Sequence, residues 1–208
     1  MSESDETLLG LFPLDLVLVP GEIVPLHIFE ERYKRLIGER LDEGVFGIVL
    51  AEEDGVRECG TTARVVELVE RLDDGRMNVL VRGERRFRIV ELRVPDDSDD
   101  DYLRAEVQYF RDSEPQGSGR LREAVLEVFF RMLALLDVPQ SEPEGDAPLS
   151  FRIAASVEFG APIKQTLLES LSEEERLETL LTVLQTVVKR LEMGVERAAA
   201  IRGNGKGY

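Results

Sequence analysis

The first half of the chain alternates apolar and polar residues in short runs, which is the pattern of half-buried β-strands. Leu14, Leu16 and Leu18 alternate in this way, and Pro20-Gly21 then breaks the run. Further strands are predicted at 45–51, 63–72, 77–81, 87–94 and 103–109. One amphipathic helix is predicted over 29–41, with Gly44 just past its end. About six short strands joined by frequent turns favour a small barrel.

Two local signals refine this sheet. Asp73-Asp74-Gly75 lies between two strand-like runs and predicts a hairpin turn. The apolar positions change face between Ile89 and Leu92, which predicts a β-bulge at that point.

The second half of the chain changes to helical spacing. Residues 112–119 have the composition of a linker, and helices are predicted at 121–136, 149–157 and 162–171. Ser172 and Glu175 have the spacing of a capping box that opens a further helix. The fold class is therefore α+β. The predicted domains are a β-barrel lobe over 8–111 and a wholly helical lobe over 120–200, and we expect disordered tails at 1–7 and 203–208.

Length and composition are those of a globular protein. The 208 residues suffice for one large domain or two smaller lobes, and they are 43% hydrophobic and 33% charged. No apolar run approaches the roughly 20 residues that span a bilayer. The acidic, polar first residues do not resemble a secretory signal, and the single Cys59 excludes an internal disulfide. These features predict a cytoplasmic location.

The net charge of −16 bears on the partners of the chain. Nucleic acids and anionic membranes attract basic surfaces, so neither is predicted as a partner. Arg82, Arg85, Arg86 and Arg88 form the one candidate basic strip. Because this segment alternates like a half-buried strand, we expect its arginines to lie on the exposed face of the sheet.

The sequence predicts no catalytic residue, no cofactor and no metal. His27 and Cys59 are the only histidine and cysteine, and we interpret them as structural residues, with a thiol-protease dyad as the alternative. Asp97, Asp99 and Asp101 imitate the start of a calcium loop, but the glycine and glutamate that such a loop requires are missing. The glycines at 203–207 lack the spacing of a phosphate-binding loop.

Several motifs together resemble the N-terminal domain family of the Lon proteases. The opening motifs are Leu11-Phe12-Pro13-Leu14, Val19-Pro20-Gly21 and the run Pro25-Leu26-His27-Ile28-Phe29-Glu30-Glu31-Arg32-Tyr33. Later matches are Phe46-Gly47-Ile48-Val49, Gly60-Thr61, Asp74-Gly75-Arg76-Met77, Gly83-Glu84-Arg85-Arg86-Phe87, Leu149-Ser150-Phe151-Arg152-Ile153-Ala154, Lys164-Gln165, Leu167-Leu168-Glu169 and Glu175-Arg176-Leu177. Since these motifs occur in order from about residue 8 to about residue 191, the resemblance is specific.

The resemblance implies a PUA-like pseudo-barrel followed by a helical bundle. It also implies a non-catalytic module that binds unfolded or extended polypeptide, with an adaptor role in protein quality control as one extension. We expect a stand-alone form, without the ATPase and Ser-Lys peptidase domains of Lon. The resemblance does not assign polypeptide-binding residues or an oligomeric state. A PUA-like RNA-binding protein is the alternative, which the net charge disfavours, and an unrecognised enzyme is a third.

The opening motif is interpreted as architectural. Phe29 and Tyr33 lie one helical turn apart, and we expect both rings to point toward the barrel. Glu30 and Arg32 are expected to form an exposed ion pair, with a buried clamp as the alternative.

Overall fold

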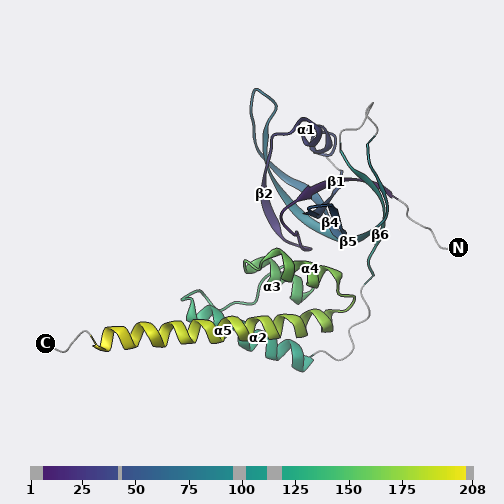
Figure 1. The fold of residues 1–208 in the computed structure, drawn as a ribbon. Helices are drawn as coiled ribbons and strands as arrows, with labels where there is room; N and C mark the ends of the chain where they lie inside the picture. The colour runs from purple at the N-terminus through teal and green to yellow at the C-terminus, as the bar shows by residue number, and fades with distance from the viewer. Residues whose placement is uncertain (1–6, 42–43, 96–101, 112–118, 205–208) are drawn as a thin grey trace. The chain divides into compact units, whose positions relative to one another are not determined.

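The computed structural model describes residues 7–41, 44–95, 102–111 and 119–204. It contains a sheet with one helix between its strands, and further helices after the last strand (Figure 1). The strands are β1 (Thr7–Leu14), β2 (Ile23–Ile28), β3 (Phe46–Glu52), β4 (Gly55–Arg71), β5 (Met77–Arg93) and β6 (Arg104–Tyr109). The helices are α1 (Glu31–Gly38), α2 (Gly119–Leu135), α3 (Leu149–Ser156), α4 (Ala161–Glu169) and α5 (Glu173–Asn204). The α+β class is confirmed. No helix in these described ranges is long and apolar enough to span a membrane.

The strands form a mixed, closed sheet. Their order is β2-β5-β4-β3-β1-β6, and a further β5–β6 pairing closes the ring β5-β4-β3-β1-β6. Closure is geometrically simple because β5 is long: its first half pairs with β2 and its second half with β6. β1 and β3 are parallel, and the remaining pairs are antiparallel. A ring of this kind leaves few free backbone edges, which is the usual advantage of a barrel.

Alternation along the strands builds the interior of the barrel. Phe12, Tyr33 and Phe46 belong to one buried cluster, in which the rings of Phe12 and Tyr33 stack at 4.1 Å. Phe87 belongs to a second buried cluster, together with residues of β1, β3 and β6. A Cβ at Gly60 would lie 2.7 Å from the Phe87 ring and 2.5 Å from a β3 carbonyl oxygen, so the ring can approach β4 only because this residue is glycine.

The two local predictions for the sheet are confirmed. The β4–β5 hairpin turns at Gly75 with a φ of 81°, and the amide of Leu72 donates to Arg76 O at 2.8 Å. The predicted bulge is the register shift between Ile89 and Glu91 in the β5–β6 pairing.

The first two strands differ from the prediction. β1 ends at Leu14, where the prediction began a strand, and β2 was not predicted. The sequence around β2 contains Pro20, Gly21 and Pro25, which indicate a chain reversal rather than a strand. Pro25 is compatible with β2 because β2 is an edge strand.

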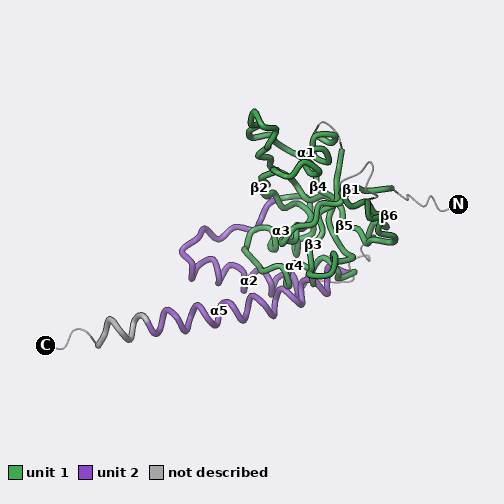
Figure 2. Tube along the Cα trace, turned by 45° about the horizontal axis from the view of Figure 1, so that its top comes forward, with its two compact units in different colours: residues 1–111, 145–171 green, residues 112–144, 172–208 purple. Residues whose placement is uncertain are grey.

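The chain divides into two compact units whose boundaries differ from the predicted domains (Figure 2). Unit 1 comprises residues 1–111 and 145–171, and unit 2 comprises 112–144 and 172–208. The predicted single helical lobe over 120–200 is therefore divided, because α3 and α4 group with the barrel. Helical periodicity identifies each helix, but it does not indicate which partner the helix packs against.

Buried polar contacts attach α4 to the barrel within unit 1. Arg86 of β5 donates to Leu168 O at 2.6 Å and to Ser170 O at 2.7 Å, and thereby caps the C-terminal end of α4. Gln165 donates to Cys59 O at 3.2 Å. Arg86 is only 6% exposed, so the prediction that the arginines of 82–88 all lie on the exposed face is wrong for this residue.

Unit 2 is built on an apolar helix–helix contact. Val125, Phe129 and Met132 of α2 are buried, and on α5 the buried apolar positions recur at helical spacing: Leu177, Leu180, Leu184 and Val188. The Ser172 hydroxyl accepts the amide of Glu175 at 3.2 Å, which is the N-terminal half of the predicted capping box.

The predicted tails are shorter in the structure where it describes them. Thr7 belongs to β1, and Gly203 and Asn204 belong to α5. The remaining residues of both predicted tails lie outside the described ranges.

Candidate functional site

Exposed apolar side chains gather on the outer side of β2, β5 and β4. Ile23 and Phe29 are 55% and 60% exposed, although residues of this size are usually buried. Pro25 is exposed and lies opposite Leu80 of β5, which is half-buried. Together with two valines of β4, these residues form a surface that we call the β2 face: Ile23, Pro25, Phe29, Val66, Val69 and Leu80.

Irregularities in β4 contribute the two valines. The β4–β5 register shifts between Val65 and Glu67 and again between Leu68 and Glu70, so that Val66 and Val69 are the extra residues. Both are exposed, at 47% and 56%. A bulge redirects side chains and often occurs beside functional surfaces, and here each bulge adds one exposed apolar side chain to β4.

The free edge of β2 limits the mode of binding that this face can support. Within the described residues β2 pairs with β5 alone. An exposed sheet edge can accept an added strand, but Pro25 has no N–H to donate to one. Proline on an edge strand is a common protection against strand pairing. The arrangement therefore favours contact through apolar side chains over strand addition.

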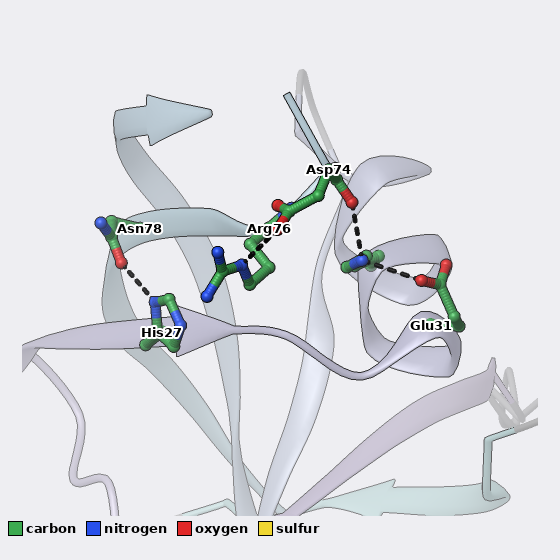
Figure 3. Close-up of polar contacts among 6 residues, drawn as sticks. His27, Glu31, Asp74, Arg76 and Asn78 are labelled. Atoms are coloured by element: carbon green, nitrogen blue, oxygen red, sulfur yellow. Dashed lines mark hydrogen bonds and ion pairs between the residues drawn. The ribbon is translucent and has the colours of Figure 1, made fainter. Parts of the chain in front are cut away.

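A row of polar side chains crosses the same three strands next to the apolar residues. His27 Nδ1 lies 2.6 Å from Asn78 Oδ1, and Figure 3 draws these two side chains facing each other. Asn78 Nδ2 in turn donates to Glu70 Oε2 at 2.9 Å. The His27 ring also stacks on Phe29, with the two centroids 6.0 Å apart. This row links β2, β5 and β4 through side chains and orients the imidazole of His27.

Helix α1 and the β4–β5 hairpin brace one end of the β2 face (Figure 3). Lys34 donates to Glu31 Oε1 at 2.8 Å and to the backbone oxygen of Asp74 at 3.0 Å. The Asp74 carboxylate accepts the backbone amide and the guanidinium of Arg76. These contacts, the backbone hydrogen bond first among them, lower the pKa of Asp74 below its usual value. The hairpin is therefore held to α1 by directed polar contacts.

A nearly buried ion pair holds the other end of β2. The Glu22 carboxylate pairs with Lys164 of α4, and both side chains are almost fully shielded from solvent. Glu22 also accepts the amide of Val19 at 3.1 Å, and its backbone oxygen accepts the amide of Gly83 at 2.9 Å. The start of the edge strand is thus fixed by both α4 and β5.

The structure does not bring together the residues considered for catalysis. His27 lies opposite Asn78, near the start of β5, whereas Cys59 lies opposite Arg88, far along the same strand. Burial raises the pKa of the Cys59 thiol, which disfavours the thiolate needed for nucleophilic chemistry. No group of three or more metal-binding side chains occurs among the residues that the structure describes. Asp97, Asp99, Asp101 and residues 205–207 lie outside them.

The opening motif behaves differently from the prediction at one residue. Tyr33 points into the barrel as expected, but Phe29 is exposed, so the prediction that both rings face inward is wrong. Phe29 precedes α1, which begins at Glu31, and therefore does not follow the helical spacing. Glu30 and Arg32 form the expected exposed ion pair at 2.7 Å. The sequence patterns therefore predicted neither the strand β2 nor the exposure of Phe29, and both contribute to the β2 face.

The sequence and the fold of this chain match a known family of domains. A family model described as the ATP-dependent protease La (LON) substrate-binding domain matches residues 9–186, and the chain belongs to this family. A crystal structure of a Lon N-terminal domain protein from Xanthomonas campestris is similar, with 29% identity and a TM-score of 0.64, covering 85% of this chain and 98% of that one. The N-terminal domain of a Mycobacterium avium complex Lon protease shares the fold at 21% identity and a TM-score of 0.65, with 86% and 98% covered.

Curated relatives are full Lon proteases. Lon protease 1 of Hydrogenovibrio crunogenus is 27% identical over 196 residues, which cover 86% of this chain and 23% of that protein. Lon protease 2 of Desulfotalea psychrophila is 29% identical over 212 residues, covering 92% and 26%. The chain thus spans about a quarter of the length of these relatives.

Proposed function

We propose that the chain binds unfolded or extended polypeptide through the β2 face. The observation that carries this proposal is the exposure of Ile23 and Phe29 beside Pro25 on a braced edge of the barrel. Contiguous exposed apolar surface is uncommon on soluble domains and marks interaction sites. Membership of the Lon substrate-binding domain family supports polypeptide as the partner.

The contacts at both ends of β2 suit this role. Lys34 holds the hairpin, and the Lys164–Glu22 pair holds the start of the strand. A surface that is ordered before binding loses little entropy when a ligand arrives, so most of the ordering cost falls on the extended client. Binding of an isolated client segment is therefore expected to be weak, about micromolar or weaker.

We further propose that the chain contributes binding rather than catalysis, and acts in the cytoplasm. The buried Cys59 and the separate position of His27 support the first point. An adaptor role in quality control is an extension of the same proposal. The RNA-binding alternative is disfavoured by the net charge of −16 and by the burial of Arg86 within the candidate basic strip.

Fluorescence anisotropy with labelled, unfolded casein tests the proposal. The double variant Ile23→Ser/Phe29→Ser removes the two largest exposed side chains of the β2 face, and we expect at least about tenfold weaker binding. The matched control is Val90→Ser/Val94→Ser, which removes two side chains that are also highly exposed, at 66% and 71%, from another part of the same unit. The control should bind casein like the wild type.

Three results would contradict the proposal. Equal loss of binding in both double variants would mean that the β2 face is not the site. Unchanged anisotropy with the wild-type chain up to about millimolar concentration would exclude polypeptide binding of the expected strength. Release of soluble casein fragments by the pure chain would contradict the non-catalytic role.

A further inference from the structure

The hydrogen bonds around His27 determine which of its ring nitrogens carries the proton. The Glu70 carboxylate can only accept hydrogen bonds, so the atom of Asn78 that faces it at 2.9 Å must be the amide nitrogen. The amide oxygen of Asn78 therefore faces His27 Nδ1 at 2.6 Å. Because this oxygen cannot donate, His27 Nδ1 must be the donor.

This assignment leaves the other ring nitrogen in an unusual state. A neutral imidazole carries one proton, and here it is on Nδ1, so Nε2 is a hydrogen-bond acceptor. Free histidine prefers the opposite tautomer, in which Nε2 carries the proton. The His27 side chain is exposed and lies between Pro25 and Phe29 on β2. The unprotonated Nε2 of His27 is thus a hydrogen-bond acceptor that lies among apolar side chains.

We propose that His27 determines the charge of the polypeptide that the β2 face accepts. This inference rests on the proposed function and adds the class of client. With the neutral ring, Nε2 accepts a hydrogen bond from a client donor, such as a backbone N–H or a lysine ammonium. Protonation converts Nε2 into a donor and adds a positive charge, so the same position then favours a carboxylate.

The charged groups near His27 come from each neighbouring element. Glu70 of β4 acts through Asn78, and the Asp74–Arg76 pair lies at the hairpin. The exposed Glu30–Arg32 pair follows β2, and Lys34 with Glu31 belongs to α1. Imidazole is the side chain whose charge characteristically changes between about pH 8 and about pH 5.5.

Nuclear magnetic resonance tests the assignment directly, since His27 is the only histidine in the sequence. Long-range proton–nitrogen correlation at about pH 8 should show the Nδ1-protonated tautomer. In Asn78→Leu the acceptor is lost, and the signal should change to the Nε2-protonated form. Predominance of the Nε2-protonated form in the wild-type chain would overturn the inference, whether or not the chain binds polypeptide.

Binding of two matched peptides tests the specificity. Both contain the same apolar segment, and they differ only in one flanking Lys or Glu. From about pH 8 to about pH 5.5, the ratio of the two peptide affinities for the wild-type chain should move toward the Glu peptide by about three- to tenfold. A change of this size corresponds to the free energy of one net hydrogen bond. In His27→Gln, whose amide does not titrate in this range, the preference should stay constant.

The failures of the two proposals are distinguishable. If both peptides bind but their affinity ratio is the same at both pH values, the role of His27 is contradicted and the proposed function stands. An equal change of the ratio in His27→Gln also contradicts the role of His27. If neither peptide binds at either pH, the proposed function itself fails, and the specificity role fails with it.

Discussion

Unit 1 and unit 2 are stabilised in different ways. Unit 1 joins strands that are distant in sequence and attaches 145–171 by buried polar contacts, among them those of Arg86 and Lys164. Unit 2 relies on an apolar stripe between α2 and α5, with residues such as Phe129 and Leu184 at its centre. A closed sheet with directed polar contacts allows one precise arrangement, which suits the presentation of a binding face. An apolar helix pair has no comparable requirement for exact polar geometry.

A single cysteine makes this comparison measurable. Cys59 lies in β4 of unit 1 and is buried, and the sequence contains no other cysteine. The rate at which a thiol reagent labels Cys59 therefore reports the opening of unit 1, while helical circular dichroism responds more strongly to the long helix of unit 2. Three substitutions use these two readouts, in order of decreasing expected effect.

Leu184→Ala should give the largest loss of stability. Leu184 is fully buried on the stripe of α5, and removal of such a side chain typically costs about 2–5 kcal/mol. The helical signal should melt earlier, while the labelling rate of Cys59 under native conditions changes little. Equally faster labelling of Cys59 would show that the two units unfold together and would break the comparison.

Arg86→Met should destabilise unit 1 by about 2–3 kcal/mol. The substitution keeps much of the aliphatic volume, but it leaves the carbonyl oxygens of Leu168 and Ser170 without their charged donor. Labelling of Cys59 should accelerate. Arg85→Met is the matched control, because Arg85 is exposed and stacks on Tyr109 at 3.7 Å, an interaction worth only about 0.5–1 kcal/mol. Similar acceleration in both variants would contradict the role given to Arg86.

Gly194→Ala should stabilise α5 by about 0.5–1 kcal/mol, the smallest of the three effects. Gly194 is helical and exposed, and an added Cβ would meet no atom within 4 Å. The expected result is a higher helical signal at elevated temperature. Gly75→Ala is a control with the opposite expected sign. It should lower the stability of the chain, because the φ of 81° at this position strains any residue with a Cβ. A loss of helical signal in Gly194→Ala would argue against a continuous helix at this position.

Much of the fold follows from local patterns in the sequence. Alternation predicted most strands, the Asp73-Asp74-Gly75 turn predicted the hairpin, and the change of face near Ile89 predicted the bulge. Helical spacing predicted α2, and the capping-box spacing of Ser172 and Glu175 predicted the start of α5. These features depend on neighbours within a few residues, which is why a single sequence contains them.

The candidate site depends on features that are not local. β2 contains Pro25 and a short run without a clear period, and its pairing with β5 is what makes it a strand. Phe29 has the residue type of a core position, yet it is exposed because α1 begins two residues later. Similarly, nothing near Arg86 in the sequence indicates that it caps a helix some eighty residues away. The sequence by itself determined most of the elements and the family. Only the tertiary structure decided which apolar residues stay exposed and which polar residues are buried, because exposure depends on chain segments that meet only after folding.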